Sequence, residues 1–198
     1  YFFCSLLIEY LFILSVLRIF AVLSIAIEDM KLLLLSSPDF FVEEDKILTT
    51  LFEEGLDVLH LRKPNSEPVY CERLLTLLPQ EHHKRIITND HFYLKEEFDL
   101  KGIHLSRRNP TMPLGYNGIV TRTCYSIEEL AAVKKECKYV ILRDIFDSKS
   151  NQNNKAKYTY EQLREASRKG LIDKHVMAQT GITLENIKEI KDLGFGGA

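Results

Sequence analysis

Polar residues follow the short apolar segments of this sequence at regular intervals, and their types suit the binding of phosphate. Arginine, asparagine, serine, threonine and glycine all offer donors to oxyanions, through guanidinium forks, amides, hydroxyls or exposed backbone N–H groups. They occur as His60-Leu61-Arg62-Lys63, Thr88-Asn89-Asp90, His104-Leu105-Ser106-Arg107-Arg108-Asn109, Thr121-Arg122-Thr123, Asp144 to Ser150, and Gln179-Thr180-Gly181. A carboxylate among them can hold Mg²⁺, which bridges phosphate oxygens, and Asp90 is the candidate. The pattern predicts a site for a phosphate or a pyrophosphate.

Each candidate also has a purely structural interpretation. Arg62 could form a salt bridge at the end of its strand, and Asn89-Asp90 could cap a helix. His104 lies within a strand, where a histidine hydrogen-bonded inside the protein is an equal alternative. Gly181 fits phosphate at a helix N-terminus but also fits a simple turn. The adjacent pair His82-His83 is expected in a solvated loop, because neighbouring side chains diverge and do not form a metal pair.

The elements that would position these residues alternate along the chain. Short apolar runs are typical of parallel strands buried on both faces, and the amphipathic stretches between them are typical of helices. The predicted strands are 31–36, 57–62, 85–88, 102–105, 118–123, 139–143 and 176–178. The predicted helices are 41–54, 69–78, 126–136, 159–169 and 183–193, with a weaker one at 90–98. Ser126 with Glu129 forms a capping-box pattern, and Thr183 with Asn186 marks another start.

Seven β/α units in this order fit either a doubly wound open sheet or a closed barrel. We expect an α/β fold, the (β/α)8 TIM barrel, lacking its eighth β/α unit, because the sequence ends at Gly194 to Ala198, where that strand would begin. An open seven-stranded remnant would leave two unpaired edges at the gap. Active sites of such barrels lie at the C-terminal ends of the strands, so the polar residues are predicted to share one rim.

The N-terminal 29 residues stand apart from this pattern. From Tyr10 to Ile27 the chain is apolar for long enough to suggest a membrane segment, but Arg18 interrupts it near the centre. A signal peptide would have a basic start and a small-residue cleavage motif, which this segment lacks. We expect residues 1–29 to be an apolar extension, with translation starting at Met30, and residues 30–198 to be the barrel domain. A membrane association is expected only if the extension is part of the native protein.

Composition restricts the function further. The net charge is -2, with 26 basic and 28 acidic residues, so no overall positive field exists to hold nucleic acid. The cysteines Cys4, Cys71, Cys124 and Cys137 show no metal-ligand spacing and no disulfide framework. We therefore expect reduced thiols in a cytoplasmic protein whose anion site is local.

Between Met30 and Ala198 the sequence resembles the thiamine phosphate synthase/TenI family. The segments that carry the resemblance are DVLHLRK, IITNDHFYL, KGIHLSRRNP, TCYSIEEL, DIFDSKS and AQTGITLENIKEIKDLGFGGA, in this order and spacing. The resemblance implies a transferase of thiamine biosynthesis that joins a hydroxymethylpyrimidine pyrophosphate to a thiazole phosphate and releases pyrophosphate, with Mg²⁺ as cofactor. Its partners would be these phosphorylated small molecules, and a homo-oligomer is left open.

The resemblance also implies roles for individual residues. Catalysis would involve Arg62, Asn89, Thr123 and Tyr125, substrate binding His60, Lys63, His104, Ser148, Ser150 and Gly181, and the metal Asp90 and Asn109. Arg62 and Asn89 would hold the pyrophosphate, Thr123 would lie near the pyrimidine, and Gly181 would offer its backbone N–H to the thiazole phosphate.

The sequence departs from the family pattern at several of these positions. His60 replaces the usual glutamine, Pro64 and Asn151 replace lysines, Asn109 replaces the second metal-binding aspartate, and Thr180 replaces a glycine. Losing a carboxylate and two cations should raise the barrier to pyrophosphate departure by several kcal/mol.

Two alternatives to a synthase follow. TenI-type members are tautomerases that aromatise a thiazole carboxylate phosphate, with a histidine as acid/base at the position of Tyr125, and a tyrosine is a poor base at neutral pH. The second alternative is a catalytically lapsed barrel, or gene fragment, that binds a phosphate compound or nothing.

Overall fold

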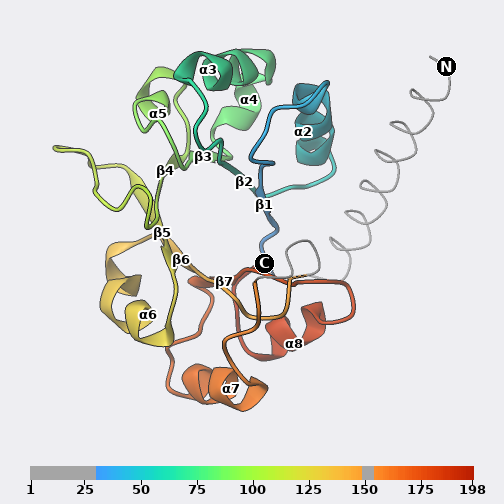
Figure 1. The fold of residues 1–198 in the computed structure, drawn as a ribbon, viewed down its shortest axis with the longest axis vertical. Coiled ribbons are helices and arrows are strands. Elements are labelled where there is room, and N and C mark those ends of the chain that lie inside the picture. Colours follow the sequence, from blue (N-terminus) through green and yellow to red (C-terminus); the bar gives the residue numbers. More distant parts are fainter. Residues whose placement is uncertain (1–29, 149–153) are drawn as a thin grey trace, which may run out of the picture.

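The computed structural model describes residues 30–148 and 154–198, and in these ranges seven parallel strands lie side by side in chain order. They are β1 (Leu33–Leu35), β2 (Val58–Leu61), β3 (Ile86–Thr88), β4 (Gly102–Leu105), β5 (Ile119–Cys124), β6 (Tyr139–Leu142) and β7 (Val176–Ala178). Figure 1 shows the strands as a ring seen end-on, with the helices around its outside. The predicted barrel architecture is confirmed, and each predicted strand contains or closely overlaps one of the seven.

The last residues of the chain lie between β7 and β1, where an eighth strand of the ring would be. Gly197 forms parallel bridges both to Lys31, just before β1, and to Met177 in β7. The Lys31 N–H donates to the Gly196 carbonyl at 2.9 Å, and the Ala178 N–H donates to the Gly197 carbonyl at 2.9 Å. The gap between β1 and β7 is therefore bridged at one end of the barrel, where the sequence had suggested two unpaired edges.

The helices that surround the ring are α2 (Glu44–Glu53), α3 (Pro68–Leu77), α4 (Gln80–His83), α5 (Leu94–Glu97), α6 (Ile127–Val133), α7 (Tyr160–Arg168) and α8 (Ile187–Asp192), with a 3-10 turn at Lys134–Glu136. No helix lies between β4 and β5, as Pro110 and Pro113 predicted. Figure 1 shows this connection extending outward from the barrel.

Helix starts differ from the predictions for local reasons. Helix α2 begins at Glu44 rather than Phe41, because Glu43 has φ 61°, outside the helical region. Ser126 caps α6 as predicted, but the Glu129 carboxylate accepts from the Tyr125 N–H. A complete capping box instead begins α7, where Thr159 and Gln162 bond each other reciprocally.

Alternation along the strands decides which side chains enter the barrel. Val58, Ile87, Tyr139, Ile141 and Met177 pack together as one apolar cluster inside it. Two larger clusters lie between the strands and the helices, one around β2 and β3 and one around β6 and β7. Because successive side chains on a strand point to opposite faces, every second residue beyond the interior cluster also faces inward, toward the end of the barrel.

Several predictions fall on residues that the structure does not describe or test. Residues 1–29, Ser150 and Asn151 lie outside the described ranges. Among the residues that are described, none of the helices is long and apolar enough to cross a membrane.

Candidate active site

A cavity of about 760 Å³ opens where the barrel strands end. Four arginines contribute to its wall, namely Arg62, Arg107, Arg108 and Arg143. Its neutral polar lining comes from Asn89, Ser106, Thr123, Ser148, Asn154, Gln179 and Thr180, and also includes the two imidazoles of His60 and His104. Within the described part of the chain no aspartate or glutamate lines it. A large cavity with this lining favours a polyanionic ligand.

The inward register of the strands explains this lining. In β2, Val58 is in the interior cluster, so His60 and Arg62 follow it on the same face. In β6 the same step of two leads from Tyr139 and Ile141 to Arg143. The cavity therefore has a floor made by residues inside the strands and a cationic rim made by the residues just beyond them.

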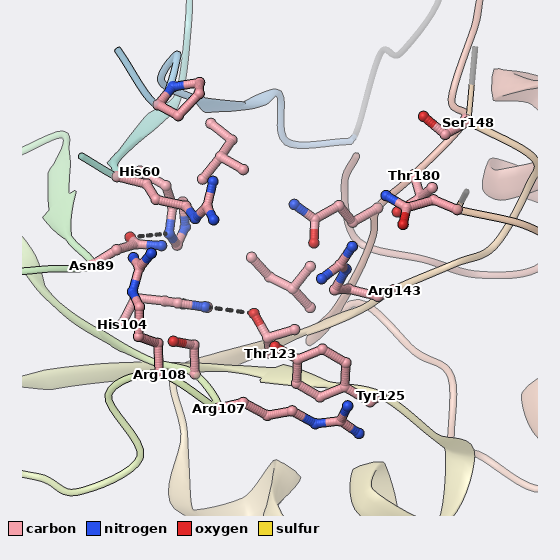
Figure 2. A pocket seen from close by; sticks show the side chains of 18 residues that line it. His60, Asn89, His104, Arg107, Arg108, Thr123, Tyr125, Arg143, Ser148 and Thr180 are labelled. Carbon is pink, nitrogen blue, oxygen red and sulfur yellow. Dashed lines mark hydrogen bonds between the residues drawn. The ribbon is translucent and has the colours of Figure 1, made fainter. Parts of the chain in front are cut away.

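Most of the predicted site residues meet in this cavity. The predicted residues that line it are His60, Arg62, Asn89, His104, Thr123, Tyr125, Ser148 and Gly181. Figure 2 shows His60, Asn89, His104 and Arg108 on one side of it and Arg143, Ser148 and Thr180 on the other. Lys63, Asp90 and Asn109 do not contribute to the lining, and Ser150 is not described.

The first part of the floor is built on His60. Its Nδ1 lies 3.2 Å from Asn89 Oδ1 and its Nε2 lies 2.6 Å from the Tyr139 hydroxyl. Burial lowers the pKa of His60 to about 4, so the ring is neutral at pH 7. A neutral ring that donates from Nδ1 to the Asn89 carbonyl oxygen accepts the Tyr139 proton at Nε2. Tyr139 and His60 together thus fix the orientation of the Asn89 amide, which lines the cavity.

The second part of the floor is built on His104. Its Nδ1 lies 2.8 Å from Thr121 Oγ1 and its Nε2 lies 2.7 Å from Thr123 Oγ1. Since the Thr121 hydroxyl donates to the Ile103 carbonyl, it accepts from Nδ1, and Thr123 donates to Nε2. Burial lowers the pKa of His104 well below its usual value. His104 is therefore the satisfied barrel histidine that the sequence had allowed as an alternative, although it also borders the cavity.

Tyr125 stands on the rim between two cations. The Arg107 guanidinium lies 3.8 Å from the centre of the Tyr125 ring, and the Arg143 guanidinium lies 5.6 Å from it. Figure 2 shows the ring between the two side chains. Cation–π contacts of this kind hold arginines in place without neutralising them, so both keep N–H donors for a ligand. The Nε–H of Arg143 is buried and has no partner among the described residues.

Lys63 takes part in a different contact from the one predicted. Its side chain is on the opposite face of the strand end from Arg62 and points toward α2 rather than the cavity. The Lys63 ammonium lies 2.6 and 2.7 Å from the two Glu44 carboxylate oxygens and 3.0 Å from the Asp39 carbonyl. Both side chains of the pair are almost completely buried. In this structure Lys63 therefore connects α2 and the β1–α2 loop to β2, and it is not positioned to contact a ligand in the cavity.

The predicted metal ligand Asp90 is surrounded by donors. Its Oδ1 accepts from Arg108 Nη2 at 2.7 Å and from Asn109 Nδ2 at 3.1 Å, and its Oδ2 accepts from the Lys63 N–H at 3.0 Å. The described residues contain no cluster of three or more histidines, cysteines or carboxylates that could hold a metal ion. Mg²⁺ is commonly held by one or two carboxylates together with water and substrate oxygens. Because Arg108 already binds the Asp90 carboxylate and Asn109 turns its amide N–H toward it, Asp90 and Asn109 are not arranged here as a pair of metal ligands.

Two loops complete the rim opposite Asn89. The Ser148 N–H after β6 donates to the Asn154 carbonyl at 2.9 Å. After β7, Thr180 and Gly181 have φ of 84° and 71°. A Cβ at Gly181 would collide with the Asp147 carbonyl, so glycine is required for the two loops to approach this closely.

Comparison with known proteins agrees with this architecture. The family model described as thiamine monophosphate synthase matches residues 36–198. The chain belongs to this family. Among curated members, a thiamine-phosphate synthase of Halalkalibacterium halodurans is 25% identical, over 84% of this chain and 83% of the relative.

Two solved structures are also similar to this chain. The crystal structure of a thiamine phosphate pyrophosphorylase from Bacteroides thetaiotaomicron is 53% identical, with a TM-score of 0.77 over 85% of this chain and 81% of that one. A thiamine phosphate pyrophosphorylase from Pyrococcus furiosus has a TM-score of 0.68 over 85% of this chain and 84% of that one. The second is only 20% identical and supports the fold alone.

Sequence reasoning overlooked some members of this thiamine monophosphate synthase site. Arg143 was assigned to the end of a strand, and Arg107 and Arg108 were noted among polar residues but given no role. Tyr139 was taken as an ordinary strand residue. The signal that could have found Arg143 and Tyr139 is the two-residue alternation through Ile141, which places all three on one face of β6.

Proposed function

We propose that this chain is a thiamine phosphate synthase-like transferase, which joins hydroxymethylpyrimidine diphosphate to thiazole phosphate and releases pyrophosphate. The observation that carries the proposal is a single cavity with four arginines and, among the described residues, no lining carboxylate. The family match and the solved relative at 53% identity support it. Both substrates bear phosphate, and such a lining suits two anions at once.

The cavity offers one group of donors to each substrate. Arg62, Asn89 and Arg108 lie toward β2, β3 and β4 and suit the diphosphate of the pyrimidine. On the opposite side, Arg143 and Ser148 lie near the Thr180-Gly181 turn and suit the phosphate of the thiazole. This assignment extends to Arg143 and Ser148 a role that the family resemblance had given to Gly181.

The chemistry is a displacement at carbon. The bond from the pyrimidine methylene carbon to the diphosphate oxygen breaks, and its electron pair leaves with pyrophosphate. The thiazole nitrogen forms the new bond with its lone pair and becomes positively charged. Negative charge grows on the departing oxygens, so fixed guanidinium and amide donors stabilise the transition state more than the ground state. Because His60 and His104 are neutral, the floor of the cavity adds no positive charge that would repel the positive charge developing on the substrates.

The tautomerase alternative receives less support. It requires an acid/base at position 125, where the cavity has the Tyr125 ring packed against two guanidiniums. The nearby imidazoles of His60 and His104 have both ring nitrogens hydrogen-bonded within the floor. A tautomerase assay on the wild type and on Tyr125→His tests this directly, since substantial wild-type activity would favour the alternative.

The synthase proposal is tested by product formation. The protein is incubated with both precursors and Mg²⁺, and thiamine phosphate and pyrophosphate are quantified by chromatography. We expect the two products in equal amounts, and a loss of about 100-fold or more in rate for Arg62→Ala. The matched control is Arg164→Ala in α7, whose side chain is half exposed and does not line the cavity, and this variant should behave as wild type. Absence of product at stoichiometric protein would refute the proposal, and pyrophosphate binding without turnover would indicate the lapsed barrel.

A further inference from the structure

We propose that Arg108 occupies the place of the divalent ion, so that this cavity binds a diphosphate without a metal. The proposal takes the class of ligand, a diphosphate, from the proposed function. It goes beyond that function by naming the cation that neutralises this ligand. It is suggested by the contact between the Arg108 guanidinium and the carboxylate of Asp90.

The carboxylate of Asp90 has its lone pairs directed at protein donors. Both of its oxygens accept hydrogen bonds, Oδ1 from Arg108 and Asn109 and Oδ2 from the Lys63 backbone. The residue is 8% exposed. A metal ion at Oδ1 would have to displace the guanidinium, which is already a charge-assisted partner at 2.7 Å, and at Oδ2 it would compete with the Lys63 N–H.

The neighbouring amide presents its nitrogen to the carboxylate. Asn109 Nδ2 donates to the Asn89 carbonyl at 2.9 Å as well as to Asp90. Because the Asn89 carbonyl can only accept, this bond fixes the orientation of the amide. Two of the groups around Asp90 are therefore N–H donors, which bind anions and cannot ligate Mg²⁺.

The position of Arg108 also suits a ligand. Its side chain is 39% exposed and lines the cavity while its Nη2 is held by Asp90. A guanidinium has five N–H donors, so those not used on Asp90 remain for a diphosphate. With Arg62, Arg107 and Arg143 the lining offers four guanidinium groups, of which Arg108 is paired with Asp90 and Arg143 lies 3.7 Å from Asp144. A diphosphate ester carries about three negative charges, so guanidinium groups can meet most of this charge without an ion.

The test measures binding of inorganic pyrophosphate by calorimetry, first with EDTA and then with saturating Mg²⁺. We expect wild-type dissociation constants within about threefold of each other, and a weakening of about tenfold or more for Arg108→Gln in EDTA. The surface control Arg164→Gln should match the wild type. Thermal unfolding of each variant verifies that it is folded. The comparison of wild-type binding in EDTA and in Mg²⁺ remains valid even if Arg108→Gln does not fold.

A converse variant strengthens the design. Arg108→Ala combined with Asn109→Asp removes the guanidinium and restores a second carboxylate, so Mg²⁺ should now strengthen pyrophosphate binding by about tenfold or more. The proposal is overturned if wild-type binding needs Mg²⁺, if Arg108→Gln binds as tightly as wild type in EDTA, or if wild type binds no pyrophosphate. Thiamine phosphate formation that requires Mg²⁺ would overturn this inference and leave the synthase intact. Pyrophosphate binding without a metal but without turnover would support this inference and count against the synthase proposal.

Discussion

Replacing Lys63 with methionine should destabilise the protein without weakening its ligand site. The Lys63 ammonium lies 2.6 Å from Glu44, and the two side chains are 0% and 3% exposed. Removing the cation leaves a buried carboxylate without its ion-pair partner, which typically costs about 3–5 kcal/mol of unfolding free energy. Since a domain of this kind is stable by about 5–15 kcal/mol, the loss should be obvious in urea unfolding at pH 7.

The double variant Lys63→Met with Glu44→Leu isolates the pair. Replacing both partners of a buried ion pair with apolar side chains is often neutral or stabilising, so most of the lost stability should return. The difference between the single and double variants then gives a coupling free energy of several kcal/mol. Phe40, whose ring centre lies 4.3 Å from the Lys63 ammonium, provides apolar surroundings for the new methionine.

The pH dependence provides a second check on the same variant. Burial raises the pKa of Glu44 above its usual value even beside Lys63, and removal of Lys63 takes away the interactions that lower it most. A carboxyl with a raised pKa in the folded state favours folding below its unfolded pKa and loses that contribution as the pH rises through the folded value. The deficit of Lys63→Met should therefore shrink as the pH is lowered from 8 toward 5.

The outcome that would refute this reasoning is specific. If Lys63 contacts substrate, as the family resemblance implied, the double variant would bind pyrophosphate at least about tenfold more weakly while Lys63→Met kept its stability. We expect binding by the double variant to stay within about threefold of wild type, because Lys63 does not line the cavity.

Three further variants test the loops and the floor of the site. Thr180→Gly should raise the unfolding free energy by about 1 kcal/mol, because Thr180 has φ 84°, and the expected rise in Tm is about 2–4 °C by calorimetry. His60 has a pKa of about 4, so the unfolded chain binds its proton first and stability falls as the pH drops through the window from 6.5 to 4. From pH 7 to pH 5 His60 alone costs about 2 kcal/mol in urea unfolding. His60→Gln should reduce the fall in stability by about this amount, and the buried His104 should account for part of the fall that is left. Arg143→Ala should weaken thiazole phosphate binding by about 10- to 100-fold in calorimetry, and an unchanged affinity would remove Arg143 from the proposed subsite.

The barrel could be predicted because its signal is repeated along the chain. Each strand is an apolar run followed by polar residues, and this pattern survives errors in any single boundary. Boundaries that depend on one backbone angle could not be predicted, as at Glu43, whose positive φ delays the start of α2. The closing contacts of Gly197 were equally hidden, since a three-residue pairing has no pattern of its own.

The burial of polar side chains was harder to predict from the sequence than the fold. His82 and His83 were expected in a solvated loop, yet both are 7% exposed in the short helix α4. The His83 ring nitrogens lie 3.0 Å from the Leu75 and Phe98 carbonyls, and the His82 ring stacks on Phe52. Such burial depends on carbonyls that meet the ring only in three dimensions, so residue type and spacing could not reveal it.

Strand parity separates the predicted site residues that line the cavity from those that do not. Arg62 and Asn89 share the inward face with His60 and Ile87, whereas Lys63 and Asp90 come one residue later and belong to the outer face. Asp90 can then influence the cavity only through what it holds, and it holds Arg108. Asparagine in place of the family's aspartate at position 109 removes a negative charge beside Asp90, and Arg108 places a positive charge there. The departure at position 109 is therefore consistent with an altered way of neutralising a diphosphate rather than with a simple loss.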